Sequence, residues 1–169
     1  SREPCPPCRS LHSWKAWGRT VNRLLLALIE TPVMPIKRVY EINGDAFSTL
    51  EEFYEEVSRK VIPEASWGRG LDAFNDILRG GFGTPDEGFV LRWSNSELSK
   101  RRLNYKETVR QLELRLQRCH PTNRDYVAAD LGRAKKGMGP TVFDWIVEII
   151  QDHGVGGEES EDGVELELK

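Results

Sequence analysis

Cysteines, long apolar runs and a strong net charge are all missing or scarce in this chain. Its 169 residues contain three cysteines, so one thiol must stay unpaired and a disulfide framework is excluded. Unpaired thiols suit a reducing compartment, and we therefore expect a cytoplasmic protein. The longest apolar run, Leu24–Ile29, is far too short to cross a bilayer, and it is followed by Glu30 and Pro32 rather than by a cleavage site. We expect neither export nor a membrane partner.

Residues that carry out catalysis or bind metal are also sparse. The histidines, His12, His120 and His153, are scattered, and none has a nucleophile with an orienting partner beside it in the sequence. Cys5 and Cys8 form a CxxC pair, but the remaining cysteine lies far along the chain, at the wrong spacing for a usual zinc site. We expect no catalytic residue, no metal site and no cofactor, and hence a protein that is not an enzyme.

Charge is distributed unevenly although the formal net charge is only -3. Basic residues dominate residues 1–38 and 92–136, whereas from Thr141 onward Lys169 is the only basic side chain. Residues 154–163 are rich in glycine and acidic residues, which predicts a solvated and mobile loop.

Residues 1–33 differ in pattern from the rest of the chain. They begin with a segment rich in proline and cysteine and lack helix caps, whereas well-patterned sequence starts at Met34. We interpret residues 1–33 as a disordered or non-native extension, with translation starting at Met34, and residues 34–169 as one domain. N-terminal sequencing of the native protein would test this interpretation.

Alternation and turn signals in residues 34–169 predict strands separated by helices. Ser48 with Glu51 predicts a capping box at the start of the first helix, and Thr141 with Asp144 predicts one at the start of the last. The expected elements are a strand at 37–42, a helix from 48 to Pro63, a helix at 70–78, a strand at 89–93 buried on both faces, a helical insertion at about 101–140, a helix from Thr141 and a strand at 164–169. This order favours an α/β fold with a parallel sheet.

Two carboxylates of the second helix, Asp72 and Asp76, lie four residues apart and opposite its apolar stripe. By spacing alone they are typical of a solvated helix face. A catalytic pair would need burial to raise the pKa of one carboxyl, and nothing in the local sequence buries either.

The string PEASWGRGLDAFNDILRGG around this pair contains Trp67-Gly68, Leu71-Asp72-Ala73, Asp76 with Leu78, and Gly80. In these residues it resembles the inhibitory segment of the barstar family of intracellular ribonuclease inhibitors. The order of the flanking strands and of the closing helix also fits, so the resemblance covers about residues 36–100 and 141–169.

The resemblance implies a small three-stranded parallel sheet packed against helices, and a second helix that blocks the active site of a nuclease. Asp76 would be the central contact, standing where the family places an acid that mimics a substrate phosphate. The implied interface consists of Trp67, Gly68, Asp72, Asn75, Asp76, Arg79 and Gly80, with Glu148 and Asp152 as a second acidic patch on the closing helix. The implied partner is a small secreted barnase-like ribonuclease, bound one to one by a chain that is monomeric when free.

The basic insertion leaves an alternative function open. Lys100–Lys136 could attract RNA, with Tyr105 or Tyr126 stacking on bases, or serve as a general protein-interaction module. A charge run on an amphipathic helix is more often only its wet face, so we do not expect direct nucleic-acid binding.

Overall fold

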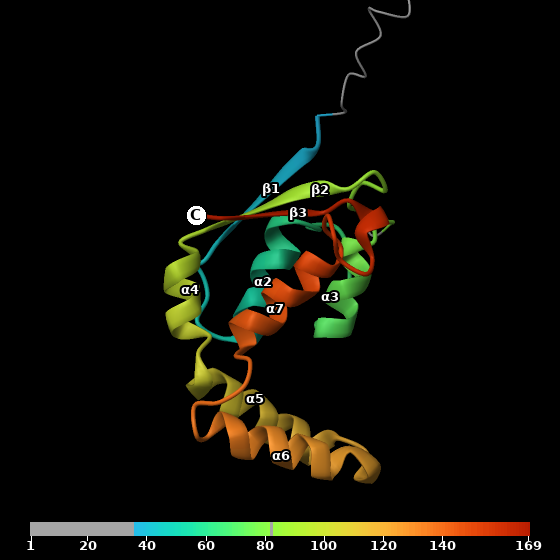
Figure 1. Cartoon of the computed structure of the whole chain (residues 1–169). Helices are drawn as coiled ribbons and strands as arrows, with labels where there is room; N and C mark the ends of the chain where they lie inside the picture. The colour runs from blue at the N-terminus through green and yellow to red at the C-terminus, as the bar shows by residue number, and fades with distance from the viewer. Residues whose placement is uncertain (1–35, 82) are drawn as a thin grey trace, which may run out of the picture. The chain divides into compact units, whose positions relative to one another are not determined.

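A three-stranded sheet with helices packed on one face forms the body of the molecule (Figure 1). The computed structural model describes residues 36–81 and 83–169. The proposed N-terminal extension and the start at Met34 lie outside the described residues.

Helices and strands follow one another in the predicted order. They are β1 (Arg38–Asn43), α2 (Leu50–Lys60), α3 (Leu71–Leu78), β2 (Phe89–Ser94), α4 (Ser96–Arg102), α5 (Tyr105–Arg118), η1 (Pro121–Asn123), α6 (Arg124–Ala134), α7 (Val142–Asp152), η2 (Ser160–Asp162) and β3 (Glu165–Leu168). None of the described helices is long and apolar enough to span a membrane.

Both strand pairs are parallel, and β2 lies in the centre of the sheet. Tyr40 of β1 is opposite Leu91 of β2, and Trp93 of β2 is opposite Leu168 of β3. Parallel neighbours must be joined by crossovers, which α2 and α3 supply before β2, and α4 to α7 before β3. The predicted α/β fold with a small three-stranded parallel sheet is confirmed.

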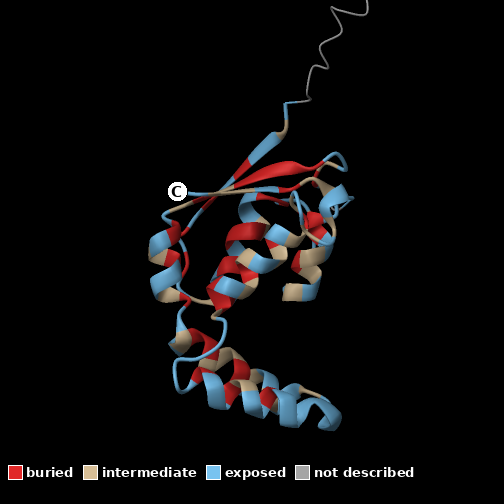
Figure 2. Ribbon diagram, in the orientation of Figure 1, coloured by how far each residue is buried: buried red, intermediate tan, exposed pale blue. Residues whose placement is uncertain are grey.

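The sheet has one face covered by helices and a second face that is buried in part, at Val90 of the central strand. Tyr40, Ile42, Leu91 and Trp93 are buried beneath α2, α3 and α7, which lie on the same side of the sheet (Figures 1 and 2). The prediction that 89–93 is buried on both faces is wrong at Arg92, which is half-buried. Its guanidinium Nε lies 2.8 Å from a carboxylate oxygen on β3, so ion pairing rather than a second helical layer occupies this part of the second face.

Aromatic side chains join the helices to the central strand. Phe53 of α2 meets Phe74 of α3 edge-on at 5.2 Å between ring centroids and stacks on Trp93 at 5.8 Å. Phe143 of α7 approaches Trp93 at 5.1 Å. Such pairs add to the free energy of simple burial, and they position α3 against the core.

The two predicted capping boxes have different outcomes. At α7, the Thr141 hydroxyl accepts from the Asp144 amide at 3.3 Å, and the Asp144 carboxylate accepts from the Thr141 amide at 2.8 Å, as predicted. At α2 the prediction is wrong by one residue, because the N-cap is Thr49 rather than Ser48. The Thr49 hydroxyl accepts from the Glu52 amide at 3.3 Å, and the Glu52 carboxylate accepts from the amide of Ser48, the residue before the N-cap, at 2.6 Å.

Helices α5 and α6 form a hairpin with a small core of its own. Leu112, Val127, Leu131 and Ala134 are buried together, apart from the main cluster. The hairpin is attached to the body through α5, where Glu107 accepts from the Leu50 amide at 3.0 Å. Residues 101–140 are largely helical, as predicted, and their status as an insertion stays a prediction.

Candidate functional site

Helix α3 presents a polar stripe on the side opposite its buried face. Phe74, Ile77 and Leu78 are buried. The helical repeat places the polar residues of this segment on the other side of the helix. They are Asp72, Asn75, Asp76 and Arg79. The helix begins after Gly70, which has no side chain to cap it. The carboxylate of Asp72 lies in the first turn, where a negative charge interacts favourably with the positive end of the helix dipole.

Both carboxylates of α3 are accessible to solvent. The Asp72 residue is exposed, and the Asp76 side chain is 54% exposed. Neither carboxylate is enclosed by the protein, so the pair lacks the desolvated setting that general acid-base catalysis requires. Their position suits contact with another macromolecule.

The loop before α3 is fastened to α2 through Trp67. Its indole N–H donates to the Ser58 hydroxyl at 2.7 Å, and its ring meets that of Tyr54 edge-on at 5.4 Å. Burial raises the pKa of the Tyr54 hydroxyl well above its ordinary value, and the nearby charges of Glu51 and Asp72 raise it further. Trp67 is therefore half-buried on its own domain, with only part of the ring free, whereas Gly68 beside it is exposed.

The loop after α3 turns sharply at Gly80. Its φ of +93° lies in the left-handed region, and a Cβ there would lie 2.9 Å from Asp86 Oδ1 and 3.1 Å from Asp86 Cα. A side chain at this position would be strained and would collide with the following turn. Gly80 is thus required for the path of the chain, whatever it contributes to an interface.

Arg79 at the end of α3 has two acidic neighbours. Its Nε and Nη2 atoms donate to the two carboxylate oxygens of Glu159 at 2.7 and 2.6 Å, whereas its Nη1 lies 3.7 Å from Asp76 Oδ1. The hydrogen bonds from Arg79 lower the pKa of the Glu159 carboxyl. Glu159, rather than Asp76, is the principal partner of this guanidinium.

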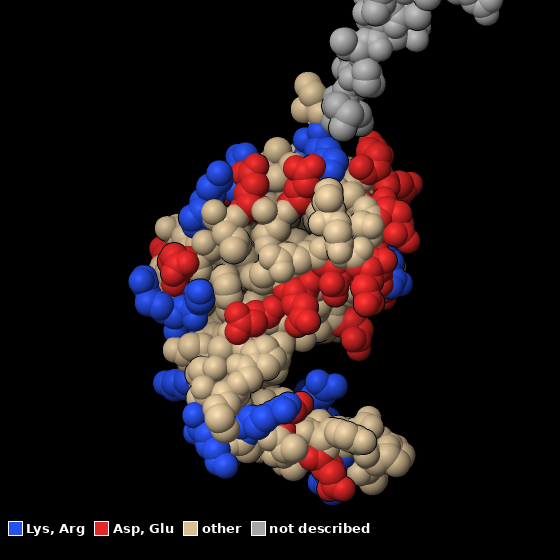
Figure 3. Space-filling model, viewed as in Figure 1, with Lys and Arg blue, Asp and Glu red and all other residues tan. Residues whose placement is uncertain are grey.

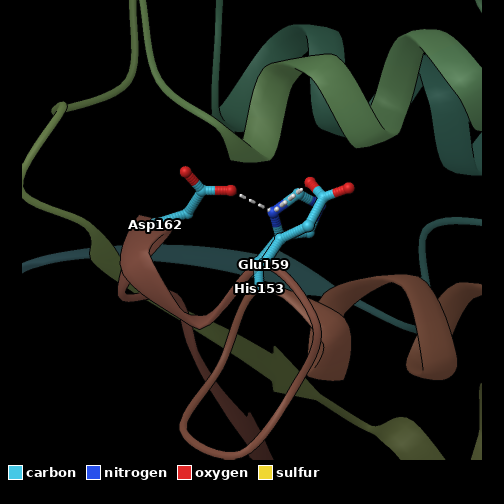
Figure 4. Close-up of side chains that lie close together, drawn as sticks. All are labelled: His153, Glu159 and Asp162. Atoms are coloured by element: carbon cyan, nitrogen blue, oxygen red, sulfur yellow. Dashed lines mark hydrogen bonds and ion pairs between the residues drawn. The ribbon is translucent and has the colours of Figure 1, made fainter.

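His153, at the C-terminal end of α7, connects α3 with the acidic loop. The residue is fully buried, and its Nε2 lies 3.0 Å from Asn75 Oδ1. Its Nδ1 lies 2.6 Å from Asp162 Oδ2 and 3.4 Å from Glu159 Oε2 (Figure 4). Asn75 is half-buried and turned toward this contact.

His153, Glu159 and Asp162 are also a group that could offer ligand atoms to a metal ion, since these atoms lie within 4.8 Å of one another. The carboxylate of Glu159 already accepts two bonds from Arg79, and Asp162 already contacts the imidazole. A metal ion would have to displace these contacts, so the geometry is that of a hydrogen-bonded network. The cysteine pair near the N-terminus lies outside the described residues.

Acidic side chains also run along α7, next to α3. Glu148 is exposed and Asp152 is half-buried. Figure 3 shows carboxylates following α7 and continuing toward α3. The two helices pack together, so this surface adjoins the polar stripe of α3.

Sequence reasoning missed the part of the site contributed by the acidic loop. The prediction that 154–163 is merely a solvated and mobile loop is wrong for Glu159 and Asp162, which contact α3 and α7. The available signal was His153 directly before a loop rich in glycine and acid. A Cβ at Gly157 would lie 2.2 Å from the carbonyl oxygen of Asp152, so this glycine permits a close backbone approach.

The basic side chains of the α5–α6 hairpin are partly neutralised by its own acids and by α2. Lys135 pairs with Glu113 at 2.9 Å, and Arg110 pairs with Glu107 at 2.7 Å. Tyr126 is 77% exposed. Tyr105, by contrast, is half-buried and donates its hydroxyl to the carbonyl of Gly139.

The fold and the site together form a small parallel α/β body with an exposed helix that carries two carboxylates. The sequence model described as Barstar (barnase inhibitor) matches residues 37–126, which is more than half of the chain. The chain therefore belongs to the barstar family, whose members are inhibitors and not enzymes. A comparison with curated protein sequences finds no match.

The family match and the structure delimit the domain differently. The match runs from β1 through α5 and into α6. Helix α7 and strand β3 lie beyond its end, yet α7 covers the sheet and β3 completes it. The closing elements therefore belong to the same body as the matched part.

Proposed function

We propose that this protein inhibits a small secreted ribonuclease of the barnase type by inserting the polar stripe of α3 into the active site. The observation that supports this proposal is the solvent access of Asp72 and Asp76 on a helix anchored through Phe74. The complex is one to one, the free chain is monomeric, and the protein acts in the cytoplasm. There it protects the cell before the nuclease is secreted.

The chemistry of the target explains why carboxylates serve this purpose. A ribonuclease must hold a cationic pocket for the substrate phosphate, so a carboxylate on a rigid helix competes directly for that pocket. Opposite charges also steer the two proteins together and raise the association rate. Asp76 occupies the centre of this contact, and Asp72 adds to the same field.

The remaining residues of the proposed interface surround Asp76. The free part of the Trp67 ring, Gly68, Asn75, Arg79 and Gly80 form the rim. On α7, Glu148 and Asp152 form a second acidic patch that extends the contact. Removing an exposed rim charge mainly changes the association rate, whereas removing one partner of a buried charge pair mainly changes the dissociation rate.

The proposal is tested by measuring inhibition of small secreted ribonucleases from the same source with the full chain and with Asp76→Ala. Losing one partner of a buried charge pair should weaken the complex by at least ~2 kcal/mol, or roughly 30-fold. Asp125→Ala removes the same charge from the first turn of α6 and should leave inhibition unchanged. Equal affinities of wild type and Asp76→Ala for the nuclease would show that Asp76 is not the central contact of the interface.

RNA binding by the α5–α6 hairpin is the second candidate function, and the exposure of Tyr126 favours it. The ion pairs of Lys135 and Arg110 count against it. Electrophoretic mobility of RNA with the full chain at rising salt separates the two functions, because phosphate binding collapses as salt rises.

A further inference from the structure

Arg79 contacts two carboxylates, one on its own helix and one from a distant loop. Asp76 lies three residues earlier on α3, the spacing at which opposite charges on a helix pair readily. Glu159 comes from the loop before β3 and accepts two parallel hydrogen bonds from the planar guanidinium. Such bidentate pairing is stronger and more directional than a single charge contact.

We propose that Glu159 is a positioning residue that holds Arg79 in a close bidentate pair, limits its contact with Asp76 to the longer one at 3.7 Å and so keeps the Asp76 carboxylate open to the partner. This inference rests on the proposed function, because it assigns Asp76 to the contact with the nuclease. It adds a role for a loop that lies outside the residues matched by the family model.

Glu159 is itself held in place. Its backbone N–H donates to the carbonyl of Asp152 at 2.9 Å, and its side chain is 31% exposed. Arg79 contributes most to lowering the pKa of the Glu159 carboxyl, and the charge of His153 and a hydrogen bond from Asn75 lower it further. The carboxylate is therefore kept charged and in position before any partner arrives.

Burial of His153 fixes the loop against α3. Its two ring nitrogens lie 3.0 Å from Asn75 on α3 and 2.6 Å from Asp162 in the loop. The ring thus bridges the helix that carries Asp76 and the segment that carries Glu159. Because the ring is fully buried, this bridge does not compete with bulk water in the way an exposed contact would.

Without Glu159, the guanidinium of Arg79 has Asp76 as its nearest remaining carboxylate. Pairing there would neutralise the charge that attracts the cationic pocket, and an incoming nuclease would first have to displace Arg79. Association should slow more than dissociation accelerates, because the change acts on the charge of the free chain.

The inference is tested by a double-mutant cycle with Glu159→Gln and Arg79→Gln in the full chain. Glu159→Gln should slow association with the inhibited nuclease by roughly threefold to tenfold at low salt. In the Arg79→Gln background the same change should have little effect, because no guanidinium is left to cover Asp76. A slowing of equal size in both backgrounds would mean that Glu159 acts only through its own charge, and it would overturn the inference.

Glu158→Gln is the matched control, since it removes the same charge from the neighbouring exposed residue. It should change the association rate by less than Glu159→Gln does. Equal effects of the two variants would also overturn the inference.

A measurement on the free chain separates this inference from the proposed function. NMR of the free chain at neutral pH reports the chemical shift of the Asp76 carboxyl carbon. Adding Arg79→Gln should change this shift much more in the Glu159→Gln chain than in the wild type. An equal response in both chains would show that Glu159 does not control the partner of Arg79. A wild-type chain that binds no nuclease, with the predicted resonance behaviour intact, would contradict the proposed function instead.

Discussion

Helix α3 and the α5–α6 hairpin are held in place in opposite ways. The hairpin buries Leu112 and Leu131 in its own small cluster, mainly through contacts between its two helices. Helix α3 has eight residues and is positioned by side chains from distant parts of the chain, including Phe53, His153 and Glu159. The helix that carries the proposed contact therefore depends more on the rest of the body than the hairpin does.

The comparison predicts different consequences of disturbing each region. A defect beneath α3 should destabilise the whole body and abolish inhibition. A defect inside the hairpin should destabilise only the hairpin. A defect where the hairpin is attached to the body should affect both parts, but with a smaller loss of stability.

The largest effect is expected for Phe74→Ala. Phe74 is 1% exposed and contacts Phe53, so truncation leaves a cavity in the main core and should lower the free energy of unfolding by ~3–5 kcal/mol. Denaturant unfolding of the full chain measures this loss, with Tyr126→Ala as an exposed aromatic control that should change stability by no more than about 0.5 kcal/mol. A loss below about 1 kcal/mol for Phe74→Ala would show that α3 is not anchored through the core.

A smaller, local effect is expected for Leu112→Ala in the hairpin. Leu112 is 3% exposed, and its truncation should cost ~2–4 kcal/mol of local stability. Hydrogen exchange should accelerate in α5 and α6 while the amides of α3 stay protected and the nuclease is still inhibited. Loss of protection in α3 would contradict the separation of the two regions.

The smallest effect is expected at the attachment of the hairpin. Burial acts to raise the pKa of the Glu107 carboxyl. Hydrogen bonds from Arg110, Gln111 and the Leu50 amide act in the opposite direction, as does the positive charge of Arg110. The net result is a pKa below the ordinary value of 4.5. The carboxylate therefore stabilises the fold at pH values above 4.5, and this contribution is lost as pH falls through the folded-state pKa.

Glu107→Gln should therefore cost about 1–2 kcal/mol at neutral pH. It should also reduce the loss of stability that the wild type shows on acidification. Unfolding free energies measured from neutral to acid pH test both expectations. Glu113→Gln, an exposed change on the same helix, is the control, and an identical acid response in both variants would mean that Glu107 does not couple the hairpin to α2.

Local patterns in the sequence predicted most of the architecture. Alternating and buried runs located the strands, and Thr141 with Asp144 marked the start of α7. The α2 cap was missed by one residue, because Ser48 and Thr49 are both good caps and each has a glutamate three residues later. The partial exposure of Arg92 could not be predicted from the sequence, because it depends on which face of the sheet the helices cover.

The candidate site was predictable only in its local part. The string around Asp72 and Asp76 pointed to the barstar family, which the family match confirms. The network of Asn75, His153 and Glu159 was missed, because its partners are separated by about eighty residues and no periodic pattern links them.

By itself, the sequence determined the order of the elements, the apolar faces of α2, α3, α5 and α7, and the acidic stripe of α3. These depend on residue spacing within one turn or strand, which the backbone geometry translates directly into faces. Only the tertiary structure decided which carboxylate Arg79 pairs with and how firmly α3 is held. Those outcomes depend on distances between side chains that folding brings together from opposite ends of the domain.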